Sequence, residues 1–178
     1  REVLAPKEAG KTIVVSMGHV AASGGYWIAM GADEIWASPT TITGSIGVFG
    51  ILPTFARPLE KLGIHTDGVG TTPLAGKLRL DRPLDPDLRR IFEQATKRTY
   101  EDFITLVSES RQMSPSAVLE VAEGRVWSGV QAKERGLVDQ TGTLQEAIDA
   151  AARIAGLGSD YHAVFLEREL TPFETFLI

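Results

Sequence analysis

A serine lies among very small residues near the start of the chain, in the run Ala-Ala-Ser-Gly-Gly at residues 21–25. The β-branched run Thr12–Val15 before it predicts a buried strand, and apolar residues at helical spacing follow it up to Gly31. We therefore expect Ser23 at a turn from a strand into a helix, where unpaired N–H groups and the helix dipole favour negative charge. This setting suits a hydroxyl whose attack creates an oxyanion, so Ser23 is the candidate nucleophile.

The turn differs from the Gly-x-Ser-x-Gly elbow of α/β-hydrolases, because Ala21 stands where the first glycine of that motif belongs. A purely structural interpretation is therefore open. In it the small residues build a tight turn, and Ser23 only caps the following helix. The residues of the turn alone do not decide between the two interpretations.

A nucleophilic serine also needs a base, and the chain offers three histidines and several lysines. His19 is only four residues before Ser23, but the intervening turn points the two side chains apart. His65 has Asp67 nearby, and His162 lies in a predicted late strand, so a Ser-His-Asp triad has weak support. A lysine can act as the base only if burial lowers its pKa of about 10.4 by roughly three units.

Further motifs occur in a fixed order over roughly residues 11–155. They are Met17–Tyr26, Ala32-Asp33, Thr43–Gly47, His65–Gly68, Thr72–Ala75, Phe103-Ile104, Gly124–Gly129, Ala132-Lys133 and Gly136–Asp139. Together these motifs resemble the signal peptide peptidase A (protease IV) family. That resemblance implies a ClpP/crotonase-like α/β fold and a membrane-bound serine peptidase with a Ser–Lys dyad. It makes Ser23 the nucleophile, with its backbone N–H in the oxyanion hole, and Ser45 the hydroxyl that orients the lysine.

The resemblance leaves the identity of the lysine open. Short members of the family carry it after the serine in the same domain, where Lys77 lies in this chain. Long members carry it in an N-terminal half that this sequence lacks, and the motifs look more like the C-terminal catalytic domain of a long member. The family also places a Gly-Gly motif before the serine for the oxyanion hole. No such motif precedes Ser23, so we expect these residues alone to be a poor enzyme or inactive.

The composition bounds the remaining functions. With 178 residues the chain fits one domain, with a core over 11–155 and an extension over 156–178. Its net charge of −5 argues against a nucleic-acid partner, and the absence of cysteine excludes disulfides and thiolate metal sites. No spacing of histidines and acids suggests a metal or another cofactor. No apolar run has the length of a membrane span, and the start at Arg1 suggests a fragment of a longer protein.

Strands alternate with helices along the chain, which predicts a mainly parallel sheet with helical crossovers. The longest predicted helix begins with Asp85 as N-cap and Pro86 in its first turn, and it runs to about Arg111. Its length of about 40 Å suggests that part of it reaches a neighbouring subunit or domain. Other strands are expected at 34–37, 46–52, 64–69 and 161–166, other helices at 53–62, 115–124, 129–135 and 144–155, and a loop at 70–85. The apolar tail 171–178 has no predicted place.

The favoured function is a serine endopeptidase that cleaves peptides in extended conformation, such as cleaved signal peptides. By resemblance it acts as a ring-like, tetramer-like homo-oligomer together with the N-terminal half of the same protein. The catalytic part then lies on the periplasmic side of a bacterial inner membrane. Two alternatives remain: a crotonase-like enzyme that acts on acyl-CoA thioesters, and a non-catalytic assembly module of a ring-shaped protease.

Overall fold

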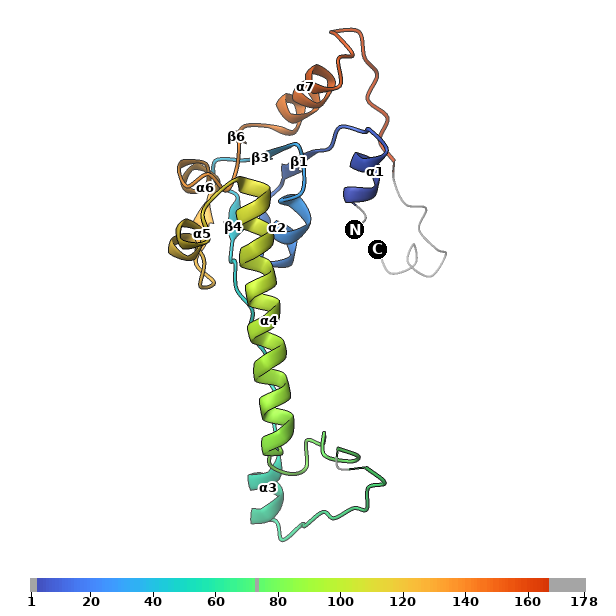
Figure 1. The fold of residues 1–178 in the computed structure, drawn as a ribbon, viewed down its shortest axis with the longest axis vertical. Helices are drawn as coiled ribbons and strands as arrows, with labels where there is room; N and C mark the ends of the chain where they lie inside the picture. The colour runs from blue at the N-terminus through green and yellow to red at the C-terminus, as the bar shows by residue number, and fades with distance from the viewer. Residues whose placement is uncertain (1–2, 73, 167–178) are drawn as a thin grey trace.

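The computed structural model describes residues 3–72 and 74–166, so the predicted apolar tail 171–178 lies outside the described residues (Figure 1). The strands and most of the short helices gather at one end of the molecule, and one long helix leads away from them (Figure 1). The strands are β1 (Val14–Met17), β2 (Val20–Ala22), β3 (Glu34–Ala37), β4 (Ile42–Gly44), β5 (Val126–Ser128) and β6 (Gln140–Thr141). The helices are α1 (Leu4–Glu8), α2 (Gly24–Ala29), α3 (Ala56–Lys61), α4 (Pro86–Arg111), α5 (Pro115–Val121), α6 (Gly129–Glu134) and α7 (Leu144–Ile154).

The strands form two three-stranded sheets, with the orders β1-β3-β6 and β2-β4-β5. The first sheet is parallel throughout, and β2 is parallel to β4, while β5 runs antiparallel to β4. This confirms the predicted α/β class with mainly parallel strands. One detail differs: the chain leaves the first sheet after Met17 and crosses into the second at Val20. A strand that the sequence did not predict therefore lies between the predicted one and Ser23.

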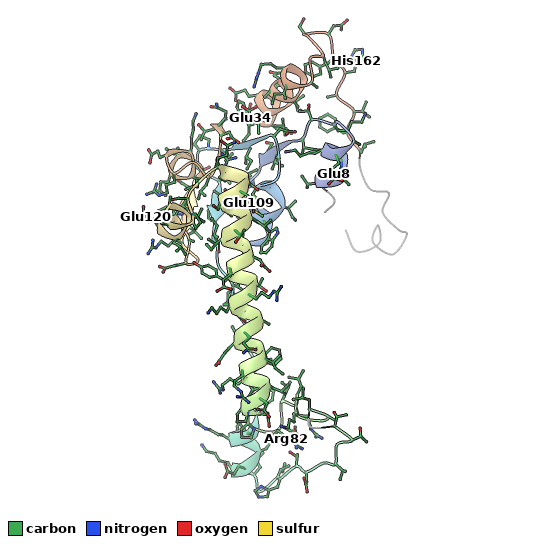
Figure 2. The ribbon with its side chains drawn as sticks, in the orientation of Figure 1. Glu8, Glu34, Arg82, Glu109, Glu120 and His162 are labelled. Atoms are coloured by element: carbon green, nitrogen blue, oxygen red, sulfur yellow. The ribbon has the colours of Figure 1, made fainter. Side chains whose placement is uncertain are left out.

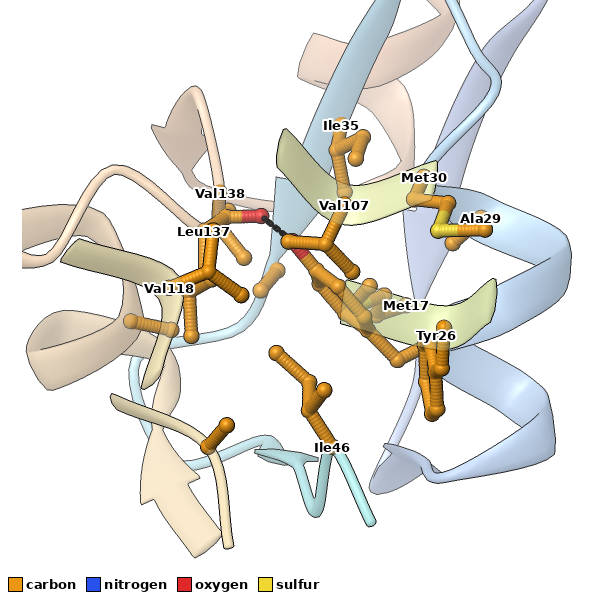
Figure 3. Packing of buried hydrophobic residues seen from close by; sticks show 14 of the residues in the cluster. Met17, Tyr26, Ala29, Met30, Ile35, Ile46, Val107, Val118, Leu137 and Val138 are labelled. Atoms are coloured by element: carbon orange, nitrogen blue, oxygen red, sulfur yellow. Dashed lines mark hydrogen bonds between the residues drawn. The ribbon is translucent and has the colours of Figure 1, made fainter. Parts of the chain in front are cut away.

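The core lies between α2, the first sheet and the last turns of α4 (Figure 3). Tyr26 on α2 is fully buried, and its hydroxyl donates a 2.9 Å hydrogen bond to the carbonyl oxygen of Leu137. Val107 from α4 and Ile35 from β3 are also fully buried. Each such apolar side chain stabilises the fold by about 1.5–3 kcal/mol. The helix that follows Ser23 is therefore anchored in the core by its inner face, through Tyr26 and Ala29.

The helix α4 confirms the prediction at both ends. The carboxylate of its N-cap Asp85 accepts hydrogen bonds from the backbone N–H groups of Asp87 and Leu88, and the helix ends at Arg111. Its 26 residues span about 39 Å. We call residues 48–97 the arm and the rest of the described chain the head. The arm comprises the chain that runs out along α4, the helix α3 at the far end and the first turns of α4 (Figure 1).

Three predicted strands are wrong, because residues 46–52, 64–69 and 161–166 have no regular secondary structure. A strand needs a hydrogen-bonded neighbour, and the first two segments lie wholly or partly in the arm, where no sheet is present. The predicted helices at 53–62, 115–124, 129–135 and 144–155 are confirmed as α3, α5, α6 and α7, with ends shifted by a few residues. The predicted loop at 70–85 contains no helix or strand in its described residues.

Candidate active site

Ser23 lies between the end of β2 and the start of α2, as the sequence predicts, and its side chain is exposed. Its backbone has φ 52° and ψ −115°, a conformation that residues with a side chain rarely adopt. Such backbone strain costs about 1–3 kcal/mol and is concentrated at functional sites. The Ser23 side chain makes no capping hydrogen bond to α2. The purely structural interpretation, in which this hydroxyl serves as a helix cap, is therefore not supported.

Ser45 lies beside Ser23, although their positions in the sequence are far apart. In the parallel pairing of β2 with β4, Ala22 is opposite Gly44, so each serine is the next residue after its strand. Neighbouring strands are about 4.8 Å apart, which sets the spacing of the two backbones. Ser45 is half-buried and also has a positive φ, 51°. The structure thus brings together the two residues that the sequence singled out.

The backbone N–H of Ser23 does not point to an oxyanion site, which corrects the expectation for this group. It donates a 2.9 Å hydrogen bond to the carbonyl oxygen of Gly44 and so is already paired. The next N–H groups belong to Gly24 and Gly25, which are exposed residues in the first turn of α2. Helix geometry leaves such first-turn groups without an intrahelical acceptor. The hydrogen bond between the Ser23 N–H and Gly44 follows from the register of β2 and β4, which the sequence alone does not give. The one sequence signal for it is the glycine in Thr43-Gly44-Ser45.

The turn is held from both sides. On one side, the buried hydroxyl of Thr43 donates a 2.7 Å hydrogen bond to the carbonyl oxygen of Ala21, in the strand that leads to Ser23. On the other side, the ring of Trp27 on α2 packs against Phe103 on α4, with ring centroids 4.4 Å apart. The strand and the helix on either side of Ser23 are therefore both fixed by the head.

Lys77 is not placed to act as the base for Ser23 within one chain. Its ammonium lies 2.9 Å from the carboxylate of Asp85, at the start of α4, and 3.5 Å from that of Asp87. Phe103, which touches the Ser23 helix, lies 18 residues further along α4, and this corresponds to about 27 Å. The hydrogen bond to Asp85, with help from Asp87, also raises the pKa of Lys77 above its ordinary value. A general base needs a shift in the opposite direction.

The three histidines do not assemble a triad with Ser23. His19 is exposed and is separated from Ser23 by the extended strand β2, His65 lies in the arm, and His162 follows α7 (Figure 2). Within residues 3–72 and 74–166, no group of three histidine or acidic side chains could hold a metal ion. In the same residues, every helix is too short or too polar to cross a lipid bilayer.

Comparisons with known proteins find relatives that match most of this chain. Protease 4 of Salmonella typhi is 42% identical over 173 residues, which are 97% of this chain and 28% of that protein. The protein named serine protease SPPA, chloroplastic, of Arabidopsis thaliana is 40% identical over 148 residues, 83% of this chain and 22% of that protein. The chain thus spans about a quarter of the length of these relatives.

Among solved structures, a mutant of ClpP1 from Listeria monocytogenes superposes with a TM-score of 0.50 at 14% identity, covering 77% of this chain and 60% of that one. At this identity the similarity concerns the fold, which is ClpP-like. The sequence model of Peptidase family S49 matches residues 5–158, a span that contains both serines, both sheets and the whole arm. The chain therefore belongs to peptidase family S49.

Proposed function

We propose that this chain is the catalytic domain of a serine peptidase and that Ser23 is its nucleophile. One observation carries the proposal: in a chain of a peptidase family, an exposed serine occupies a strained turn between strand and helix, with Ser45 beside it. The Ser23 Oγ attacks the carbonyl carbon of the scissile bond, and its proton passes to a base. The backbone N–H of Gly24, in place of the paired N–H of Ser23, is the oxyanion donor on this chain.

The resulting tetrahedral intermediate collapses with loss of the amine, which takes the proton from the base and leaves Ser23 acylated. Water that is activated by the same base then hydrolyses the ester and restores the hydroxyl. The base in this proposal is a lysine outside the chain, since Lys77 is engaged with two carboxylates in the arm. Ser45 orients the amine of that lysine. The second oxyanion donor also lies outside these residues.

The substrate in this proposal is a peptide in extended conformation. In the part of the chain that the structure describes, β2 pairs only with β4, so its other edge is open for backbone hydrogen bonds next to Ser23. Small apolar residues at the cut site, cleaved signal peptides as substrates and a periplasmic position at a bacterial inner membrane follow from the family resemblance.

The arm supports a further part of the proposal, namely a ring-like homo-oligomer. Its surface carries a groove of about 1180 Å³ between residues 48–58 and α4. Apolar side chains that are exposed in one chain are candidates for burial against a second copy. In the arm they are Phe49, Ile51, Leu52, Phe55, Leu62, Ile64, Val69, Leu74, Leu78, Leu80 and Ile91.

Labelling with a fluorophosphonate tests the nucleophile in the full-length protein that carries these residues. We expect Ser23→Ala to abolish labelling and peptide cleavage. Ser16→Ala is the matched control, because Ser16 is also an exposed serine but lies in β1 of the other sheet. Undiminished labelling of Ser23→Ala would remove Ser23 from the mechanism. Unchanged peptide cleavage by that variant would favour the assembly-module alternative, and coenzyme A binding in calorimetry would favour the crotonase-like one.

A further inference from the structure

The segment Gly124–Trp127 pairs through its backbone with the residues around Ser45. Its strand β5 runs antiparallel to β4, with Trp127 opposite Thr43. Two backbone hydrogen bonds extend this pairing. The N–H of Ser45 donates to the carbonyl oxygen of Arg125 at 2.8 Å, and the N–H of Gly124 donates to that of Ile46 at 3.0 Å. The backbone on either side of the Ser45 side chain is therefore fixed by one short segment.

Within this segment, the indole of Trp127 lies directly against Gly44. A Cβ atom on Gly44 would come within 2.8 Å of Cδ1 of that ring, and Gly44 itself has φ +77°. The carbonyl oxygen of Gly44 is the acceptor for the N–H of Ser23. The ring thus contacts Gly44, which precedes Ser45 in the chain and accepts the hydrogen bond from Ser23. Gly44 must be a glycine both for its backbone conformation and for the close approach of the ring.

The indole is itself held in a single orientation. Its Nε1–H donates a 3.0 Å hydrogen bond to the carbonyl oxygen of Val121, at the end of α5. The guanidinium carbon of Arg135 lies 3.9 Å from the centre of the ring, a cation–π arrangement. Arg135 in turn donates to the carbonyl oxygen of Gln131 in α6. Two helices therefore fix the ring that touches Gly44.

We infer that Trp127 is a positioning residue that keeps Gly44 and Ser45 in the arrangement in which Ser23 reacts. The inference rests on the proposed function of Ser23. Ser23 and Ser45 are residues with a side chain that nevertheless have positive φ, a conformation that persists only where the surrounding structure imposes it. Trp127 supplies this constraint through the contact of its ring with Gly44. Its removal should slow the chemical step more than it weakens binding.

The experiment follows fluorophosphonate labelling of the full-length protein over time and separates kinact, KI and the final labelled fraction. We expect Trp127→Ala to lower kinact about 10²-fold, as small misplacements at active sites do. Trp127→Phe keeps an aromatic ring but loses the Nε1 donor, and we expect a loss of about fivefold. KI and the final labelled fraction stay unchanged in both variants. Trp36→Phe is the matched control, because the Trp36 Nε1 has no partner among the described residues.

A folded Trp127→Ala variant with the kinact of the parent overturns the inference. So does a lower labelled fraction with an unchanged kinact, since that result means that Trp127 only keeps the domain folded. If Trp127→Ala does not fold, the variants Trp127→Phe and Arg135→Gln test the inference instead. A kinact equal to that of the parent in both variants then overturns it. An unlabelled parent, or a Ser23→Ala variant that still labels, instead refutes the proposed function and does so independently of Trp127.

Discussion

In the head, side chains far apart in the sequence bury one another, whereas the arm buries almost nothing. Tyr26 in α2, Phe103 in α4 and Leu137 in the turn between α6 and β6 are all almost fully buried. Among the described residues of the arm, Leu88 is the only one that is buried. The head therefore has the core of an independent domain. The arm, in one chain, has the apolar surface of half an interface.

Among the described residues, ion pairs between positions far apart in the sequence occur only in the head. In the arm, ion pairs join near neighbours in sequence, such as Arg79 with Asp81 and Lys77 with Asp85. In the head, Arg111 at the end of α4 binds both carboxylate oxygens of Asp139, which is 28 positions away. Local pairs hold a loop in shape, while long-range pairs join elements of a fold. The comparison agrees with the proposed function, in which the head keeps the Ser23 site in order and the arm contacts other copies.

The largest effect on stability is expected from replacing a buried phenylalanine of the head by alanine, and the same replacement in the arm is the comparison. Phe103→Ala empties a site that is 1% exposed and removes the ring packed on Trp27, so we expect unfolding to become easier by about 3–5 kcal/mol. Phe49→Ala removes a ring that is 85% exposed, and we expect a change within about 0.5 kcal/mol. Urea denaturation followed by circular dichroism measures both. A Phe49→Ala loss that grows with protein concentration would show that the arm is buried between copies.

A smaller effect is expected where α4 joins the head. The side chain of Arg111 is 10% exposed, and its guanidinium also donates to the carbonyl oxygen of Gly136, while Asp139 accepts from the N–H of Ile35. Burial disfavours its charge, but Asp139 outweighs this and raises the pKa of Arg111. Arg111→Met leaves Asp139 without its cation and should cost about 2 kcal/mol, less than a fully buried pair because Asp139 is partly exposed.

Arg79→Met is the arm counterpart, and we expect it to leave the urea midpoint unchanged because Arg79 is exposed and its partner Asp81 is close in sequence. If Arg79→Met and Arg111→Met lowered the midpoint equally, the distinction between local and long-range pairs would be wrong. The double variant Arg111→Met/Asp139→Leu should recover part of the lost stability, since it no longer leaves a carboxylate without a partner.

Acid should distinguish the two regions through their carboxylates. Hydrogen bonds from the N–H of Ile13 and from Lys7 lower the pKa of Asp33, and both partners are lost when the chain unfolds. Because its folded pKa lies below the unfolded one, Asp33 stabilises the head above about pH 4, and this contribution disappears as the pH falls through the folded pKa. Asp33→Asn should therefore flatten the dependence of the unfolding free energy on pH below about 4.

The arm carboxylate Asp81 should contribute less, although its hydrogen bond with Arg79 lowers its pKa to about 2. Arg79 is two positions away and stays close in the unfolded chain, so the folded and unfolded pKa values of Asp81 differ less. Chemical denaturation at pH values from 2 to 7 compares Asp81→Asn with Asp33→Asn. A steeper loss in the Asp81 variant would mean that the arm ion pairs depend on the fold.

What the sequence could predict depends on the range of the interactions involved. The sequence predicts the ends of α4 to within a residue. Its start depends on local effects, because Asp85 accepts hydrogen bonds from the first N–H groups and Pro86 suits the first turn. The strand predicted at 46–52 failed and β5 was missed, since strand formation depends on partners elsewhere in the chain. At the site, the local turn is enough to predict Ser23 as a candidate nucleophile, whereas Ser45 is predicted only through the family resemblance. The pairing with Gly44 and the contact with Trp127 required the register of the sheet.

The smallest effect is expected at Lys77, and it tests whether the arm takes part in catalysis. Lys77→Met should leave the rate of Ser23 labelling and its pH profile unchanged, because the ammonium pairs with Asp85 at the end of α4 distant from Trp27. Lys61→Met is the matched control, an arm lysine on α3.

If Lys77→Met alone abolished labelling, the lysine would have to reach the Ser23 of another copy. The arm would then be part of the active site as well as a contact surface. Mixing Lys77→Met with Ser23→Ala protein would identify that case, since mixed oligomers would regain labelling.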